Sequence, residues 1–386
     1  MTKNQSYYLD NAATTRPFEK VVEQVEFCLV EDFGNPSSVH LPGVRAKRLV
    51  EESRGILAGI FGVPLEGVFF LSGGTESDNL AIKGLFEFPL SEEVELITTP
   101  LEHSAVLRTT DWLKARGVKI RMVRIDPSTA RVDLDHLESL VGPKTRLVSV
   151  HHVNSETGII QDLSAISRRV KKKNPSCLFH SDGVQAFGKL EVNLKLLGVD
   201  LYSISGHKFH AVKGSGALIM GKKIKLNAMI HGGAQERGLR SGTESVPLIS
   251  AMGMAAKKIY GELETNFEKV ERFEQELLNL LKRSLPELKI LVMEEKLPHI
   301  ISLAYPMIPG EVLLHHLAQK GVYVSTGSAC HASDKKLSQT LTTLRFPTQR
   351  IKETIRISLD PYELPERAAA LVDIFSEVVL ELKRLV

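Results

Sequence analysis

Two segments place polar side chains where a buried strand should end. In FFLSGGTESDNLAIKG, two glycines follow the strand and a helix begins near Thr75. Free backbone amides at a helix N-terminus, reached through glycines such as Gly74, form a cradle for a phosphate group. The alternative is an ordinary turn between a strand and a helix, with Thr75 as its cap. In CLFHSDGVQAFG, Asp182 follows the next candidate strand and Gln185 lies close by. A carboxylate there can keep a pyridine nitrogen protonated, although Asp182 could also cap the following helix.

A lysine follows a third apolar strand, in DLYSISGHKFHAVKGSGAL. Lys208 comes directly after this strand, where a solvated lysine is unusual. About one strand–helix–strand unit separates it from Asp182, so we expect both on neighbouring strand ends. Near a phosphate site and a cationic ring, its amine can form a Schiff base. A lysine on the surface is the alternative.

One cysteine lies among small and polar residues, in GVYVSTGSACHASDKKLSQTL. No apolar period buries Cys330, and the nearby histidine and lysines favour its thiolate. A passive loop cysteine is the alternative. The other two cysteines, Cys28 and Cys177, are distant and no CxxC pair exists. This spacing argues against a zinc site or a disulfide framework, so we predict no metal site.

Alternating strands and helices are expected to position these side chains. Such alternation predicts an α/β fold with a mostly parallel sheet covered on both faces, which binds ligands at the carboxyl ends of its strands. The helical segments include Val44–Phe61, Ala105–Arg116 and Leu163–Lys172. The predicted strands are Val68–Leu71, Glu95–Thr98, Ile120–Ile125, Leu147–His151, Cys177–His180, Leu201–Ile204 and Ala217–Met220.

The last third of the chain has a different pattern. A helical stretch from Ile249 to Leu281 is ended by Pro286. It is followed by strand candidates near Ile290, at Ile300–Ala304 and at Thr354–Leu359, and by a closing helix from Pro365 to Val386. We therefore expect a smaller α+β domain, with the long helix as its connector.

Composition limits the class of protein. The 386 residues are 43% hydrophobic and 25% charged, which is typical of a globular protein of about two domains. The net charge is +3, and the one basic run, Arg168–Lys173, suits a helix C-terminus, so no nucleic-acid partner is expected. No stretch is typical of a signal peptide or a membrane span, so we expect no membrane partner and a cytoplasmic location.

Several motifs in order resemble those of the cysteine desulfurases in the class V aminotransferase group, from Tyr8 almost to the C-terminus. They are YLDNAATT (Tyr8–Thr15), GNPSSVH (Gly34–His40), SGGTESDNLAIKG (Ser72–Gly84), EHSAV around His103, SGHK (Ser205–Lys208), QERGLRSGT (Gln235–Thr243), GSAC (Gly327–Cys330) and IRISL around Arg356. Each is a weak signal alone. Together, and in this order, they are specific.

The resemblance implies pyridoxal 5'-phosphate as the cofactor and the aminotransferase-type fold (fold type I). Its large domain would span 15–255 with a seven-stranded sheet, and 1–14 with 256–386 would form the small α+β domain that carries the cysteine loop. Lys208 would be the Schiff-base lysine, and His103 would stack on the ring and move protons. The other cofactor-binding residues would be Gly74, Thr75, Ser155, Asp182, Gln185, Ser205, His207 and, from the second subunit of a homodimer, Thr243.

The resemblance also implies the reaction. Arg356, with Asn11 and Ser155, would bind the substrate L-cysteine, and Cys330 would attack its sulfur to give a persulfide and alanine. A sulfur acceptor, such as an iron–sulfur scaffold protein, would receive the persulfide. This chain has Ser155 where the group commonly has a second asparagine before the glutamate.

Two other functions fit parts of the pattern. A selenocysteine lyase or a small aminotransferase of the same group would share the cofactor site without needing Cys330. A non-catalytic relative could serve as a partner in a sulfur-transfer complex, and the replacement at Ser155 is the one feature that favours this role.

Overall fold

A seven-stranded sheet forms the centre of the computed structural model, which describes residues 6–292, 295–326 and 337–384. Its strand order is β2-β8-β7-β6-β5-β3-β4, and every pairing is parallel except those of β8 with β2 and β7. The mostly parallel sheet is therefore confirmed. The strands are β2 (Val68–Leu71), β3 (Glu95–Thr98), β4 (Lys119–Met122), β5 (Thr145–Ser149), β6 (Leu178–Asp182), β7 (Leu201–Ser205) and β8 (Gly216–Met220).

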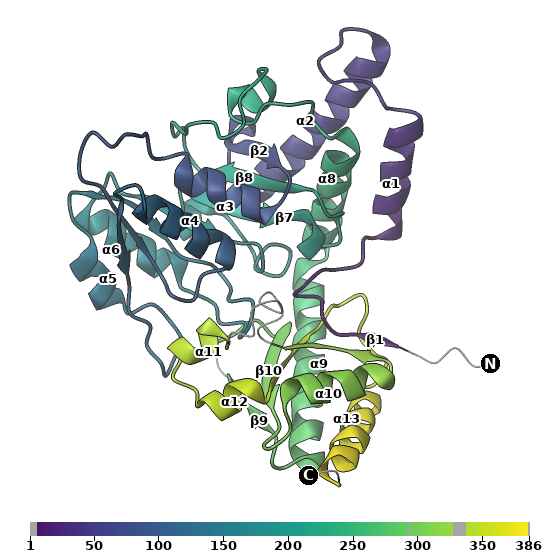
Figure 1. The fold of residues 1–386 in the computed structure, drawn as a ribbon. Helices are drawn as coiled ribbons and strands as arrows, with labels where there is room; N and C mark the ends of the chain where they lie inside the picture. Colours follow the sequence, from purple (N-terminus) through teal and green to yellow (C-terminus); the bar gives the residue numbers. More distant parts are fainter. Residues whose placement is uncertain (1–5, 293–294, 327–336, 385–386) are drawn as a thin grey trace.

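Both faces of this sheet are covered, because its strands are apolar on both sides. In β2, Val68 and Phe70 join one hydrophobic cluster, whereas Phe69 and Leu71 join another. The second cluster includes side chains of α3 (Gly74–Lys83) and α4 (Ser104–Lys114), which lie in front of the sheet in Figure 1. The helices that contribute to the first cluster are α1 (Glu19–Val30), α2 (Leu41–Phe61), α5 (Leu134–Leu140), α6 (Leu163–Lys173), α7 (Leu194–Leu197) and α8 (Val246–Gly261).

A smaller antiparallel sheet lies below the large one in Figure 1. Its order is β12-β13-β10-β9, and helices packed on it form a separate hydrophobic cluster. The elements of this region are α9 (Leu263–Ser284), β9 (Lys289–Ile290), β10 (Ile300–Ala304), α10 (Gly310–Gln319), β12 (Ser325–Thr326), α11 (Gln339–Thr343), α12 (Thr348–Lys352), β13 (Thr354–Ser358) and α13 (Ala368–Lys383). None of the helices within the described ranges is long and apolar enough to cross a membrane.

Two differences from the predicted elements concern the connecting helix and the N-terminal segment. The single helix expected from Ile249 to Leu281 is two helices, α8 and α9, because Glu262 leaves helical geometry with φ −120° and ψ 12° directly after a glycine. The N-terminal strand β1 (Tyr7–Tyr8) was not predicted and pairs in parallel with β11 (Val322–Tyr323). A two-residue strand has too few side chains to show a period, so only its distant partner reveals it.

Candidate active site

Most of the side chains singled out in the sequence meet around one cavity of about 360 Å³. It lies at the carboxyl ends of β6 and β7, where a parallel sheet is expected to bind ligands. Ten of the predicted site residues line it, namely Gly74, Thr75, His103, Ser155, Asp182, Gln185, Ser205, His207, Lys208 and Arg356.

The N-terminus of α3 forms one wall of this cavity. A Cβ atom added to Gly216 would lie 2.5 Å from the Cα of Gly73, so β8 and the turn before α3 meet backbone to backbone. A Cβ atom on Gly74 would lie 2.8 Å from Val184, so the turn also packs closely against the segment after β6. The first residues of α3, Gly74 and Thr75, thereby stand at the cavity, and free amides at a helix N-terminus suit an anion.

His207 belongs to the same wall. Its Nδ1 atom lies 3.2 Å from the hydroxyl of Thr14. Burial lowers the pKa of His207 to about 4, and the nearby Lys208 and Lys213 act in the same direction. The imidazole is therefore neutral at pH 7 and adds no positive charge of its own.

The acid Asp182 ends β6 and is followed by the turn that carries Gln185. The backbone amide of Val184 donates to Oδ1 of Asp182 at 2.9 Å. Burial raises the pKa of Asp182, whereas the nearby His103 lowers it. The Gln185 side chain donates to the carbonyl of Ala12 at 2.9 Å, and its buried Oε1 has no hydrogen-bond partner in the described part of the chain.

Lys208 follows β7 in a single turn of 3-10 helix, Gly206–Lys208. Its Nζ atom donates to the carbonyls of Ala12 and Ala13 at 2.6 and 2.8 Å. The amine is thus directed toward the cavity by the N-terminal segment. His103 is an exposed residue that precedes α4, and its Nδ1 accepts the amide of Ala105 at 3.1 Å.

Arg356 comes from β13 of the smaller sheet and enters the same cavity. One of its terminal nitrogens donates to the backbone carbonyl of Ser155 at 2.9 Å, and the other to Asp10 at 2.8 Å. The buried Nε of Arg356 has no partner among the described residues. A buried guanidinium beside an open cavity is suited to bind a carboxylate.

Three predicted site residues do not line this cavity or cannot be placed. Asn11 is buried, and its amide donates to the backbone carbonyls of Tyr8 and Ser358 at 3.2 and 3.1 Å. Thr243 is exposed on the loop before α8. Cys330 lies outside the described residues.

The structure adds polar residues that sequence reasoning did not select. Asp78 and His151 line the cavity. His151 contacts the buried Glu102 through Nδ1 at 3.0 Å. The sequence could have indicated Asp78, because it lies one helical turn after Thr75 and therefore on the same side of α3. His151 gave no such signal, because it follows β5 in an apolar run.

Comparison with known proteins places this arrangement in a family. The family model described as aminotransferase class-V matches residues 7–371. The chain belongs to this family. A cysteine desulfurase IscS from Methanosarcina thermophila is 35% identical over 388 residues, which cover 100% of this chain and 94% of the relative. Another, from Dictyoglomus turgidum, is 36% identical over 378 residues, covering 97% and 95% of the two chains.

Two solved structures have the same fold as this chain. A structure described as a NifS-like protein superposes with a TM-score of 0.91 at 36% identity and covers 97% of this chain and 99% of its own. A structure described as SspA in complex with cysteine has a TM-score of 0.82 at 29% identity, with coverage of 93% and 100%. The class V aminotransferase assignment therefore rests on the full length of the chain.

The residues at the cavity fit the cofactor of this family. A phosphate matches the N-terminus of α3, a ring nitrogen matches Asp182, and an aldehyde matches the Lys208 amine. The buried Oε1 atom of Gln185, without a partner in the described ranges, is the kind of atom that a bound ligand satisfies. These matches come from separate segments of the chain, and all of them are compatible with the same cofactor.

Proposed function

We propose that this protein is a pyridoxal-phosphate-dependent cysteine desulfurase. The observation that carries the proposal is that one cavity brings together an amine, a buried acid, a helix N-terminus and an arginine. In the proposed reaction, L-cysteine and the thiol of Cys330 give L-alanine and a persulfide on Cys330. The carbon–sulfur bond of the substrate breaks, a sulfur–sulfur bond forms, and the thiol proton balances the new C–H bond of alanine.

The cofactor would be held by residues that end or follow strands of the large sheet. Lys208 would carry it covalently, Thr75, Ser205 and His207 would bind its phosphate, and Asp182 would pair with its ring nitrogen. When bound, pyridoxal phosphate supplies an electron sink for the carbon atoms of the substrate. Gln185 and Ser155 would complete the contacts with the ring.

The substrate would be positioned from the opposite side. Arg356 would bind the carboxylate of the substrate. Asn11, which follows β1, would also contribute to substrate binding. His103 lies at the edge of the cavity, where an imidazole can move protons near neutral pH. The selective feature of the proposed reaction is the thiol of Cys330, because an aminotransferase or a lyase of the same family does not require it.

The proposal is tested at Lys208 and Cys330. Purified protein should be yellow, and borohydride should fix a pyridoxyl group on Lys208 in mass spectra, whereas Lys208→Ala should have no turnover and Lys213→Ala should resemble wild type. Cys330→Ala should bind cofactor and cysteine but release no alanine in step with sulfide. Cys28→Ala and Cys177→Ala serve as controls, since both of these thiols are buried. Label on Lys213, or undiminished desulfuration by Cys330→Ala, would overturn the assignment.

We further propose a homodimer in which Thr243 of each subunit contributes to the phosphate site of the other. The exposed loop around Thr243 and an apolar surface on α1 and α2, described below, support this proposal. We also propose the domain division 15–255 against 1–14 with 256–386, a sulfur acceptor such as an iron–sulfur scaffold protein, and a cytoplasmic location. Disulfide trapping of partners on Cys330 would identify the acceptor.

A further inference from the structure

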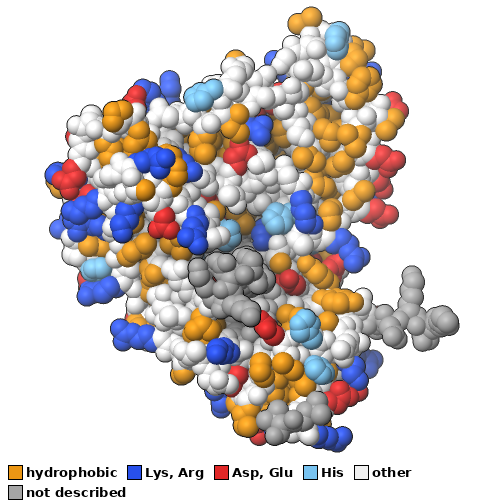
Figure 2. All heavy atoms as spheres, viewed as in Figure 1, with side chains coloured by type: hydrophobic (Ala, Val, Ile, Leu, Met, Phe, Trp, Pro, Cys, Tyr) orange, Lys and Arg blue, Asp and Glu red, His pale blue; other side chains and the backbone are white. Residues whose placement is uncertain are grey.

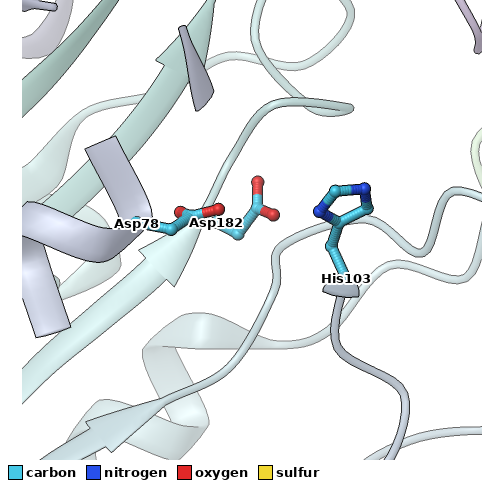
Figure 3. A group of neighbouring side chains, drawn as sticks. All are labelled: Asp78, His103 and Asp182. Atoms are coloured by element: carbon cyan, nitrogen blue, oxygen red, sulfur yellow. The ribbon is translucent and has the colours of Figure 1, made fainter. Parts of the chain in front are cut away.

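A second acid lies beside Asp182 in the wall of the cavity. Asp78 projects from the first turns of α3 and is only 1% exposed. One carboxylate oxygen of Asp78, one of Asp182 and one ring nitrogen of His103 all lie within 4.8 Å of one another. Figure 3 shows the two carboxyl groups adjacent, with the ring of His103 on the far side of Asp182 from Asp78. Two carboxylates this close in a buried wall cannot both ionise freely.

A base that contacts Asp78 is the buried histidine His180, whereas His103 lies on the far side of Asp182. Nε2 of His180 lies 3.6 Å from Oδ1 of Asp78. Both ring nitrogens of His180 are engaged by hydroxyls, Nδ1 with Ser149 at 2.9 Å and Nε2 with Ser203 at 3.1 Å. Burial lowers the pKa of His180 to about 3, so this imidazole is neutral at pH 7.

The remaining neighbours favour a neutral acid at this position. The groups that influence Asp78 are the carboxyl groups of Asp182 and Glu102, which repel a negative charge, and the hydroxyl of Ser203, which stabilises one. Burial, more than any of them, raises the pKa of Asp78 well above its usual range. The Oδ1 atom of Asp78 has no hydrogen-bond partner among the described residues.

Asp182 has the support that Asp78 lacks. It accepts the amide of Val184 at 2.9 Å, and His103 and His151 lower its pKa against the effects of burial and of Glu102. If the pair holds one proton, the proton therefore resides on Asp78 and the charge on Asp182.

We propose that Asp78 is a positioning residue that stays protonated and leaves Asp182 as the single carboxylate facing the ring nitrogen of the cofactor. The inference rests on the proposed function for the identity of that ring. A neutral acid behind Asp182 keeps the wall at one negative charge, which matches one protonated ring nitrogen. With two negative charges, the wall would carry more charge than the ring nitrogen can balance. With no negative charge, the ring nitrogen would have no partner.

The first test needs no turnover. Apoprotein at pH 7.5 should show the infrared carbonyl stretch of a protonated carboxylic acid in a buried site. The band should disappear in Asp78→Asn and persist in Asp182→Asn. Absence of this band from wild-type apoprotein, or its survival in Asp78→Asn, would overturn the proposal. The proposed desulfurase activity would stand in either case, because the two are measured separately.

The second test compares the variants toward pyridoxal phosphate itself. Asp78→Asn keeps a neutral group of the same shape, so its dissociation constant should remain within about threefold of wild type. Asp182→Asn removes the charge that pairs with the ring nitrogen and should weaken binding by about tenfold or more. Equal weakening by both variants would contradict the assignment of the charge to Asp182.

The third test covers the case in which a variant folds poorly. A buried acid with a raised pKa keeps its proton in the folded protein and loses it on unfolding, so it lowers stability as the pH rises above about 4. The difference in urea midpoint between Asp78→Asn and wild-type apoprotein should therefore increase in favour of the variant from pH 5 to pH 8. A difference that stays constant across this range would show that Asp78 is not the protonated member.

Discussion

Arg356 is oriented before any substrate arrives. Its two terminal nitrogens are fixed by the side chain of Asp10 and the backbone carbonyl of Ser155, at 2.8 and 2.9 Å. These contacts come from distant parts of the chain, one from the segment after β1 and one from the loop after β5. Because an arginine side chain has several rotatable bonds, such contacts lower the entropy lost when it binds a carboxylate.

Loss of the Asp10 contact should therefore affect substrate binding more than the chemical step. We expect Asp10→Asn to raise KM for L-cysteine by about tenfold, the cost of one hydrogen bond to a charged group, with a smaller change in kcat. Glu287→Gln, which alters an ion pair with the surface residue Lys383, is the control and should leave both constants unchanged. A fall in kcat with constant KM would instead place Asp10 in the chemical step.

At the level of elements, a buried ion pair attaches the loop before α8 to helix α2, and a backbone hydrogen bond attaches it to the large sheet. Glu236, in the 3-10 turn η3 (Gln235–Gly238), accepts two bonds from Arg54 of α2 at 2.9 and 3.0 Å and one from the amide of Phe70 at 2.9 Å. It has a positive φ of 44°, which is unfavourable for a residue with a side chain. The ion pair offsets this strain and fixes the loop that ends at Thr243.

Breaking this pair should destabilise the fold. Removal of one partner from a buried ion pair costs about 3–5 kcal/mol, so Glu236→Gln should lower the free energy of unfolding by that order. Arg237→Ala is the matched control, because Arg237 is exposed and its carbonyl contacts are 3.3 to 3.4 Å long. In the double variant with Arg54→Met, part of the loss should return, and urea unfolding measures all four proteins.

At the level of the whole molecule, the surface around α1 and the start of α2 is strongly apolar. Figure 2 shows hydrophobic side chains gathered on this part of the molecule. Patches of this kind usually mark an interface between protein chains. Its exposed members are Val22, Phe27, Leu29, Val30, Phe33, Val39, Leu41 and Val44.

Charges on this surface should dissociate the proposed homodimer. We expect Val30→Asp with Phe33→Asp to give a monomer in sedimentation velocity, because each charge would be desolvated in the interface. Leu196→Asp on α7 is the control: Leu196 is 71% exposed, as Phe33 is at 72%, but lies outside this surface. If the Val30 and Phe33 variant stays dimeric, the interface lies elsewhere.

The whole fold should also lose stability in acid through its buried histidines. His152 contacts the hydroxyl of Tyr202 at 2.7 Å, and burial lowers its pKa to about 4. Below pH 6.5 His152 is protonated in the unfolded chain, but in the folded chain it stays neutral until about pH 4. The free energy of unfolding therefore falls as the pH drops through this window. The full effect is about 3 kcal/mol.

A variant isolates this contribution from those of other groups. Urea unfolding of His152→Gln apoprotein should depend less steeply on pH between 6.5 and 4 than that of wild type. His315→Gln, at an exposed position of α10, should not change the slope. Parallel curves for wild type and His152→Gln would contradict a neutral His152.

Sequence alone was sufficient for the elements that depend on local pattern. β2, β3 and β10 have the predicted limits, and the other predicted strands of the large sheet shift by a few residues at their ends. The reason is physical: strands of a parallel sheet are buried on both faces, so they appear as short apolar runs between amphipathic helices. Lys208, Asp182 and the glycine turn before α3 could be found because each follows such a run directly.

Only the tertiary structure decided which distant groups meet. β1 has only two residues and is recognisable as a strand only because it pairs with β11. Asp10 contacts Arg356 although almost the whole chain separates them in sequence. Asp78 was one of several polar residues on α3 until β6 placed Asp182 beside it. Local periodicity determines which face of an element is buried. The charge state and partner of a buried polar group depend on through-space neighbours, which the order of residues does not encode locally.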